Sequence, residues 1–189
     1  MYLRSAPVGP PLTKEEHMQR LFLSSAVCAF AAAVALATPA AAETVTVQLR
    51  GFEEVPVNVS PATGSLRLFI NDRAGTIDYE LTYDNLVGTV TQSHIHVGQM
   101  SVNGGITLWL CGTSFSATTP GPAGTPTCPA GRSGTVTGTL TAANVQPITA
   151  QLVTAGDLDD VIRAIRSGVA YGNVHSTVEL GGEIRAQLH

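Results

Sequence analysis

The sequence predicts an all-β domain, a Greek-key sandwich or a flattened barrel, with one short helix near residues 157–167. Two observations support this prediction. Short runs in which β-branched or aromatic residues alternate with polar ones recur through residues 44–188. Clusters of Gly, Pro, Asn and Asp separate these runs and are typical of turns. Seven or eight such runs in one stretch favour a sandwich or a barrel over other β architectures.

Each expected strand is identified by its alternation and by the turn residues that bound it. The strands cover residues 44–49, 64–70, 76–83, 105–111, 134–140, 170–175 and 183–188, and a further one includes residues 93–97. The sequence Asn-Asp-Arg-Ala-Gly at 71–75 is typical of a hairpin loop between its two flanking strands.

One segment has the periodicity of a helix. Its apolar residues recur at i, i+3, i+4 and i+7, which places them on one face: Leu158, Val161, Ile162 and Ile165. Asp157 is a suitable N-cap, with Asp160 three residues later, and Gly168 is a typical C-terminal stop. We expect this helix to pack across one end of the barrel.

The N-terminal region is typical of an exported protein. Residues 18–42 contain a basic residue, an apolar run and a final Ala-Ala-Ala, the pattern of a secretory signal peptide cleaved before Glu43. The alternative is an uncleaved anchor, for which the apolar run is marginally short. Residues 1–17 show no periodicity, and we interpret them as a disordered upstream extension, with Met1 or Met18 as the start. The expected mature domain is residues 43–189, in the periplasm or secreted.

The charge of this mature domain excludes some partners. It has seven arginines, no lysine and twelve acidic residues, which gives a formal charge of −5. Because no basic residues cluster, nucleic acid is not an expected partner. No second apolar stretch is long enough to cross a membrane.

Two cysteines remain after signal cleavage, Cys111 and Cys128. An even number of cysteines in an exported protein predicts a disulfide. The segment between them is rich in Gly, Pro, Ser and Thr, so closing this loop should stabilise the fold by about 3 kcal/mol. The alternative is a thiol pair for metal binding or redox chemistry, which usually has tighter spacing.

Three of the five histidines form the candidate functional site. His94 and His96 lie two apart on an expected strand and therefore share one face, opposite Ile95. His175 lies on another expected strand and meets them if the two strands are neighbours. Imidazole nitrogens bind copper, zinc and nickel, and three of them leave one coordination position open. These residues predict a transition-metal site, with copper favoured over zinc.

Other residues are candidates to support this site. Glu54, Glu183, Met100 or water are possible fourth ligands, and a thioether from Met100 would favour copper. Glu183 could instead orient a histidine, and Arg185 could pair with Glu183 or with a ligand carboxylate or phosphate. We expect Glu183, Arg185 and Gln187 to form a solvated face with a cross-strand ion pair. The alternate residues Ile184, Ala186 and Leu188 should face the core.

Five segments in order resemble the CHRD domain, the module named from the repeats of chordin, which also occurs singly in exported bacterial proteins. These are Glu-Val-Pro at 54–56, Ser-His-Ile-His-Val-Gly at 93–98, and the segments 133–140, 171–175 and 182–188. The resemblance covers about residues 44–188 and implies an extracytoplasmic β-rich domain with no established reaction. A fainter resemblance, to the barrel of copper-zinc superoxide dismutases, rests on the His-x-His pair alone, and we infer no activity from it.

Three functions remain open from the sequence. The first is an exported binding module that holds a transition metal. The second is a structural or interaction domain, in which the histidines form a buried polar network and the loops bind an unidentified extracytoplasmic protein or polymer. The third is a dismutase-like or oxidase-like metalloenzyme. No nucleophile elbow and no phosphate-binding loop is present, so no catalytic residue is assigned and an enzyme is not favoured.

Overall fold

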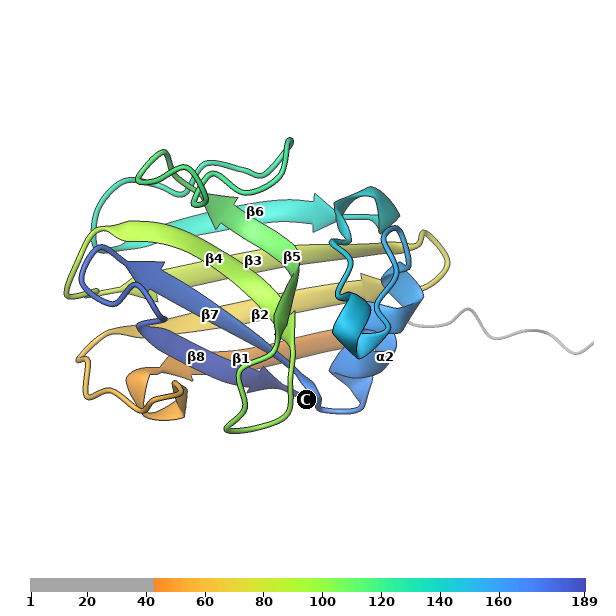
Figure 1. Cartoon of the computed structure of the whole chain (residues 1–189), viewed down its shortest axis with the longest axis horizontal. Coiled ribbons are helices and arrows are strands. Elements are labelled where there is room, and N and C mark those ends of the chain that lie inside the picture. The colour runs from red at the N-terminus through yellow and green to blue at the C-terminus, as the bar shows by residue number, and fades with distance from the viewer. Residues whose placement is uncertain (1–42) are drawn as a thin grey trace, which may run out of the picture. The chain divides into compact units, whose positions relative to one another are not determined.

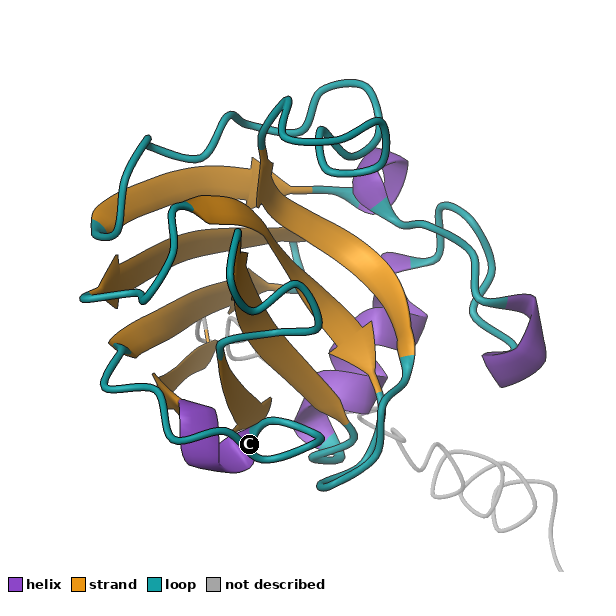
Figure 2. Ribbon diagram, turned by 60° about the vertical axis from the view of Figure 1, so that its left-hand side comes forward, coloured by secondary structure: helices purple, strands orange, loops and turns teal. Residues whose placement is uncertain are grey.

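The computed structural model of the chain describes residues 43–189. Eight antiparallel strands form one sheet in the order β5-β4-β7-β8-β1-β2-β3-β6. The sheet curls into a nearly closed barrel with β5 and β6 at its edges (Figures 1 and 2). The predicted all-β class is confirmed. The predicted signal peptide and upstream extension lie outside the described residues.

The bounds of the elements agree with the sequence prediction to within a few residues. The strands are β1 (Glu43–Arg50), β2 (Thr63–Asn71), β3 (Thr76–Asp84), β4 (Val90–Val97), β5 (Gly105–Gly112), β6 (Gly134–Leu140), β7 (Ala170–Ser176) and β8 (Ile184–Leu188). Three short 3-10 helices lie in the connections: η1 (Gly51–Glu53), η2 (Ala142–Asn144) and η3 (Thr149–Gln151). The predicted hairpin joins β2 to β3, where Asn71 pairs with Thr76 and Gly75 adopts a φ of 64°.

Alternating apolar side chains fill the inside of the barrel. On β1, Val45, Val47 and Leu49 are buried while the residues between them are exposed, and β2 and β3 follow the same rule. The strands β7 and β8 differ, because every residue in them is buried. Their outward side chains are polar and are covered by loops. The barrel therefore has an apolar core and a second, polar layer outside one wall.

The predicted helix is α2 (Leu158–Arg166), and it lies at one end of the barrel (Figure 1). Asp157 caps it by accepting a hydrogen bond from the Asp160 backbone N–H at 3.0 Å. Its four predicted core residues are all buried. Gly168 follows the helix with a φ of 67°, as a C-terminal stop requires. No helix among residues 43–189 is long and apolar enough to cross a membrane.

The predicted disulfide joins Cys111 to Cys128, 17 residues apart in sequence. It fastens the end of β5 to the long loop that leads to β6. A backbone hydrogen bond from Cys128 N–H to the Gly112 carbonyl, 2.9 Å long, reinforces the same junction. This loop covers the side of the barrel where the edge strands β5 and β6 face each other.

Candidate metal centre

The register of the sheet brings the three predicted histidines together. In the β4–β7 pair, His94 lies opposite Asn173, His96 opposite Tyr171, and Gln92 opposite His175. All these side chains point outward from the barrel, on the face opposite Ile95. One ligand atom from each histidine lies within 4.8 Å of the corresponding atoms of the other two. The predicted convergence of His94, His96 and His175 is confirmed.

The histidine cluster is buried although it lies outside the barrel. His94, His96 and His175 are only 0%, 7% and 6% exposed. The β1–β2, β4–β5 and β7–β8 connections cover them, and these connections also contact one another. The Asn103 amide donates to the Val55 carbonyl at 2.9 Å.

The prediction that the outward side chains along β8 form a solvated face is wrong for the same reason. Glu183, Arg185 and Gln187 are 0%, 1% and 5% exposed, because these connections close over them. Glu183 and Arg185 form no ion pair in the described chain. Alternation predicted correctly which side chains share this face, and the opposite residues Ile184, Ala186 and Leu188 are in the core.

Backbone carbonyls fix the tautomers of two histidines. His96 donates from Nδ1 to the Gly104 carbonyl at 3.0 Å, and His175 donates from Nδ1 to the Leu180 carbonyl at 2.9 Å. A neutral imidazole carries one proton, so the Nε2 atom of each ring bears a lone pair. Histidines that bind metals are commonly held in this way, with the remote nitrogen bonded to a carbonyl or carboxylate.

These lone pairs meet few donors. His94 Nδ1, His96 Nε2 and Asn173 Oδ1 form a triangle with sides of 3.0, 3.2 and 3.2 Å. Since His96 Nε2 and Asn173 Oδ1 are both acceptors, a proton on His94 Nδ1 is the only one that can lie between the three atoms. The remaining atoms His94 Nε2 and His175 Nε2 are buried and have no hydrogen-bond partner among the described residues. Buried polar atoms without partners are uncommon in folded proteins and call for an explanation.

Burial keeps all three imidazoles neutral. Loss of hydration, reinforced by the neighbouring His175 and His96, holds the pKa of His94 well below its ordinary value. Burial lowers the pKa of His96 to about 4, against the opposing effect of its hydrogen bond to Gly104. The pKa of His175 is also lowered, again mainly by burial. Neutral imidazole is the form that binds metal ions.

Glu54 is a buried residue close to Asn173, one corner of the triangle. The residue is 5% exposed, and burial raises the pKa of its carboxyl to about 7. The charge of Arg185 and hydrogen bonds from the Val55 backbone and the Asn173 amide oppose this rise. Asn173 Oδ1 lies 3.2 Å from His94 Nδ1 and 3.2 Å from His96 Nε2. Asn173 stands two residues before His175 in the sequence, so strand alternation alone places the two side chains on one face.

Aromatic rings enclose the cluster. Trp109 packs edge-on against His94, with ring centroids 4.7 Å apart, and Tyr171 stacks on His96 at 4.5 Å. The guanidinium of Arg185 lies 3.4 Å from the centre of the Tyr171 ring. Arg185 is thus connected to His96 through one ring.

The other predicted supporting residues lie elsewhere. Glu183 Oε1 accepts from the Ser60 hydroxyl and the Val87 backbone N–H, at 2.7 and 2.6 Å, so its carboxylate ties two loops to β8. Met100 is 68% exposed, and its thioether lines a surface cavity. Of the possible additional ligands, Glu54 alone is linked to the histidines, through Asn173.

The fold and the ordered motifs define a known class of protein. The family profile of the CHRD domain matches residues 45–188, nearly all of the described chain. The chain therefore belongs to the CHRD-domain family. No curated protein and no solved structure matches it significantly.

Proposed function

We propose that this protein is an exported binding module that holds a transition-metal ion, with copper favoured, through His94, His96 and His175. One observation carries the proposal. Three neutral imidazoles are buried together, and His94 Nε2 and His175 Nε2 have no hydrogen-bond partner among the described residues. A cation there would satisfy nitrogen atoms that the protein itself leaves without partners.

The spacing of the triangle atoms supports a single ion, provided that His94 carries its proton on Nε2 so that Nδ1 can bind the ion, with Asn173 Oδ1 as a further oxygen ligand. Ligands at 2.0–2.1 Å from a tetrahedral ion lie about 3.3 Å from one another. The sides of the triangle, 3.0–3.2 Å, are close to this value. Binding of His175 to the same ion requires this ring to move closer, since the three histidine ligand atoms span up to 4.8 Å.

Copper is favoured by the ligand type. Imidazole suits both copper and zinc, and Cu(II) is the tightest-binding divalent ion of its row at most nitrogen sites. The exposed position of Met100 leaves no support from a thioether. The disulfide fits a protein that works in an oxidising compartment, which supports export.

A structural role for the histidines is the second candidate. Its support is that His96 and His175 each bond a separate loop carbonyl, as network residues would. A metalloenzyme has less support, because the cluster is closed to solvent and no substrate could reach an open coordination position without loop movement.

Titration of the purified protein with Cu(I), Cu(II) and Zn(II) in competition with a chromophoric chelator tests the proposal. We expect one ion per chain for wild type and loss of that ion in the His94→Ala, His96→Ala double variant and in His175→Gln. His189→Ala, which changes a histidine outside the cluster, is the control. Identical stoichiometry and affinity in wild type and the double variant would refute the metal site.

A further inference from the structure

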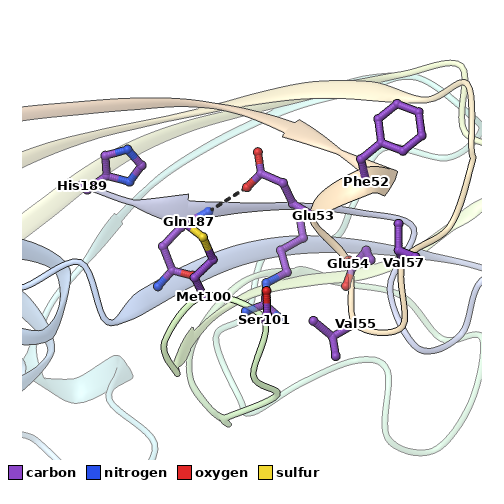
Figure 3. A pocket seen from close by; sticks show the side chains of 10 residues that line it. Phe52, Glu53, Glu54, Val55, Val57, Met100, Ser101, Gln187 and His189 are labelled. Atoms are coloured by element: carbon purple, nitrogen blue, oxygen red, sulfur yellow. Dashed lines mark hydrogen bonds between the residues drawn. The ribbon is translucent and has the colours of Figure 1, made fainter.

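A second feature of the molecule is the β4–β5 connection, residues 98–104, and the way in which it is fastened beside the histidine cluster. Residues 99–103 are all exposed. Met100 and Ser101 line a surface cavity of about 550 Å³, and Figure 3 shows them across this cavity from Phe52 and Val57. Because the cavity leaves this side of the connection without packing, its position depends mainly on the contacts that it makes toward the barrel.

Arg185 on β8 supplies three of these contacts. Its buried guanidinium donates to the carbonyls of Gln99 and Val102 and to the amide oxygen of Asn103, at 3.0–3.3 Å. All three acceptors belong to the β4–β5 connection. A guanidinium is planar and presents its N–H donors in a fixed geometry, so it sets the positions of several acceptors at once. Arg185 therefore fixes the connection at three points.

The connection ends at Gly104, which contacts two rings of the cluster. The Gly104 carbonyl accepts a hydrogen bond from His96 Nδ1 at 3.0 Å, and its N–H donates to the Tyr171 hydroxyl at 3.2 Å. The Tyr171 ring stacks on His96 with an angle of 6° between the ring planes. The guanidinium of Arg185 lies over this same Tyr171 ring. Arg185 thus reaches His96 by two routes, through the Tyr171 ring and through the connection that ends at the Gly104 carbonyl.

We propose that Arg185 is the positioning residue of the histidine cluster. By holding the Gly104 carbonyl and the Tyr171 ring against His96, it keeps the His96 proton on Nδ1 and directs the Nε2 lone pair toward His94. This inference deepens the proposed metal site and rests on it. Groups that orient a metal-binding histidine typically raise the affinity for the metal ten- to a hundredfold.

Nitrogen-15 NMR of metal-free, histidine-labelled Arg185→Lys tests the positioning role. Lysine keeps the positive charge but has neither the planar fork nor the stacking surface of arginine, so the three acceptors lose their common anchor. In wild type we expect two well separated nitrogen resonances for His96, one protonated and one not. In the variant they should move toward each other, because the proton is then shared between Nδ1 and Nε2. The matched control is Arg166→Lys, at an arginine paired with Glu43 and Asp72, which should leave His96 unchanged.

A second variant changes an exposed residue and so leaves the core intact. Asn103→Ala removes one acceptor of Arg185 and also the 2.9 Å hydrogen bond from the Asn103 amide to the Val55 carbonyl. It should shift the His96 resonances in the same direction as Arg185→Lys, by a smaller amount. Gln99→Ala, on the same connection, is its control, because Gln99 bonds Arg185 through its carbonyl and not through its side chain. This control should leave the His96 resonances in place.

Titration with Cu(I) in competition with a chelator gives an independent readout. Arg185→Lys should bind Cu(I) at least about tenfold more weakly than wild type, at an unchanged stoichiometry. Equal affinity of the two proteins for Cu(I) would overturn the proposal. His96 resonances that stay in place in both Arg185→Lys and Asn103→Ala would overturn it as well. Since the resonances are measured without metal, failure of wild type to bind Cu(I) would refute the metal site and not the positioning of His96.

Discussion

The metal-free protein should lose stability as the pH falls from about 7 to about 4, because its buried histidines are held neutral. The pKa of His96 is lowered from 6.5 to about 4. Its contribution to the free energy of unfolding is complete above pH 6.5 and is lost as the pH falls through 4, since the unfolded chain takes up the proton first. A difference of this size corresponds to about 3 kcal/mol. His94 and His175 have lowered pKa values too and act with the same sign.

Glu54 acts in the opposite direction. Burial raises its pKa from 4.5 to about 7, so the folded state holds a proton that the unfolded state releases. Its neutral form stabilises the fold fully below pH 4.5, and this stability is lost as the pH rises through 7. Between pH 4.5 and 6.5 Glu54 therefore offsets part of the histidine effect. The free energy of unfolding still rises with pH over this range, because the effects of three histidines outweigh that of one carboxyl.

Urea denaturation followed by circular dichroism, at intervals from pH 4 to 8 with chelator present, measures these effects. Glu54→Gln should be more stable than wild type at pH 8, by about 1–3 kcal/mol, and should lose stability more steeply on acidification. His96→Gln should show a shallower loss. If wild type is equally stable at pH 4.5 and pH 7, or if Glu54→Gln runs parallel to wild type, the assignment of buried neutral groups is wrong.

Three further predictions concern the scaffold. Replacing both cysteines, Cys111→Ser with Cys128→Ser, should lower the free energy of unfolding by about 3 kcal/mol in urea, and an unchanged midpoint would contradict this. Gly182→Ala should destabilise by about 1–3 kcal/mol, because its φ is 128° and a Cβ would lie 2.4 Å from Glu54 Oε1. Its neighbour Gly181→Ala, with open space around it, should stay within about 0.5 kcal/mol. Asp157→Ala should lower the melting temperature through the loss of about 1 kcal/mol of helix capping, and Asp159→Ala, which caps nothing, should not.

Much of the architecture was predictable because it follows from local periodicity. Strict alternation in β1 to β3 identified both the strands and their inward faces, and the spacing of four apolar residues identified α2. The shared face of His94 and His96 followed from the same rule. Their meeting with His175 needed the additional assumption that β4 and β7 are neighbours, which the strand order confirms.

The covering of the candidate site was not predictable from the same patterns. Alternation says that Arg185 lies on the face opposite the core, but it does not say whether water or a loop lies beyond it. Burial of Arg185 depends on the β4–β5 connection, whose carbonyls accept its hydrogen bonds, and such long-range contacts leave no periodic signal. The neutral state of Glu54 depends on the same burial and was hidden for the same reason.

Nitrogen-15 NMR of histidine-labelled protein tests the central claim most directly, because it reports each imidazole nitrogen separately. In the metal-free protein we predict that His96 and His175 carry their proton on Nδ1, where the carbonyls of Gly104 and Leu180 accept it. One equivalent of diamagnetic Cu(I) should shift the Nε2 resonances of both rings and leave the Nδ1 protons in place. Unchanged Nε2 resonances at excess Cu(I) would show that nothing binds between the histidines and that they form a structural network only.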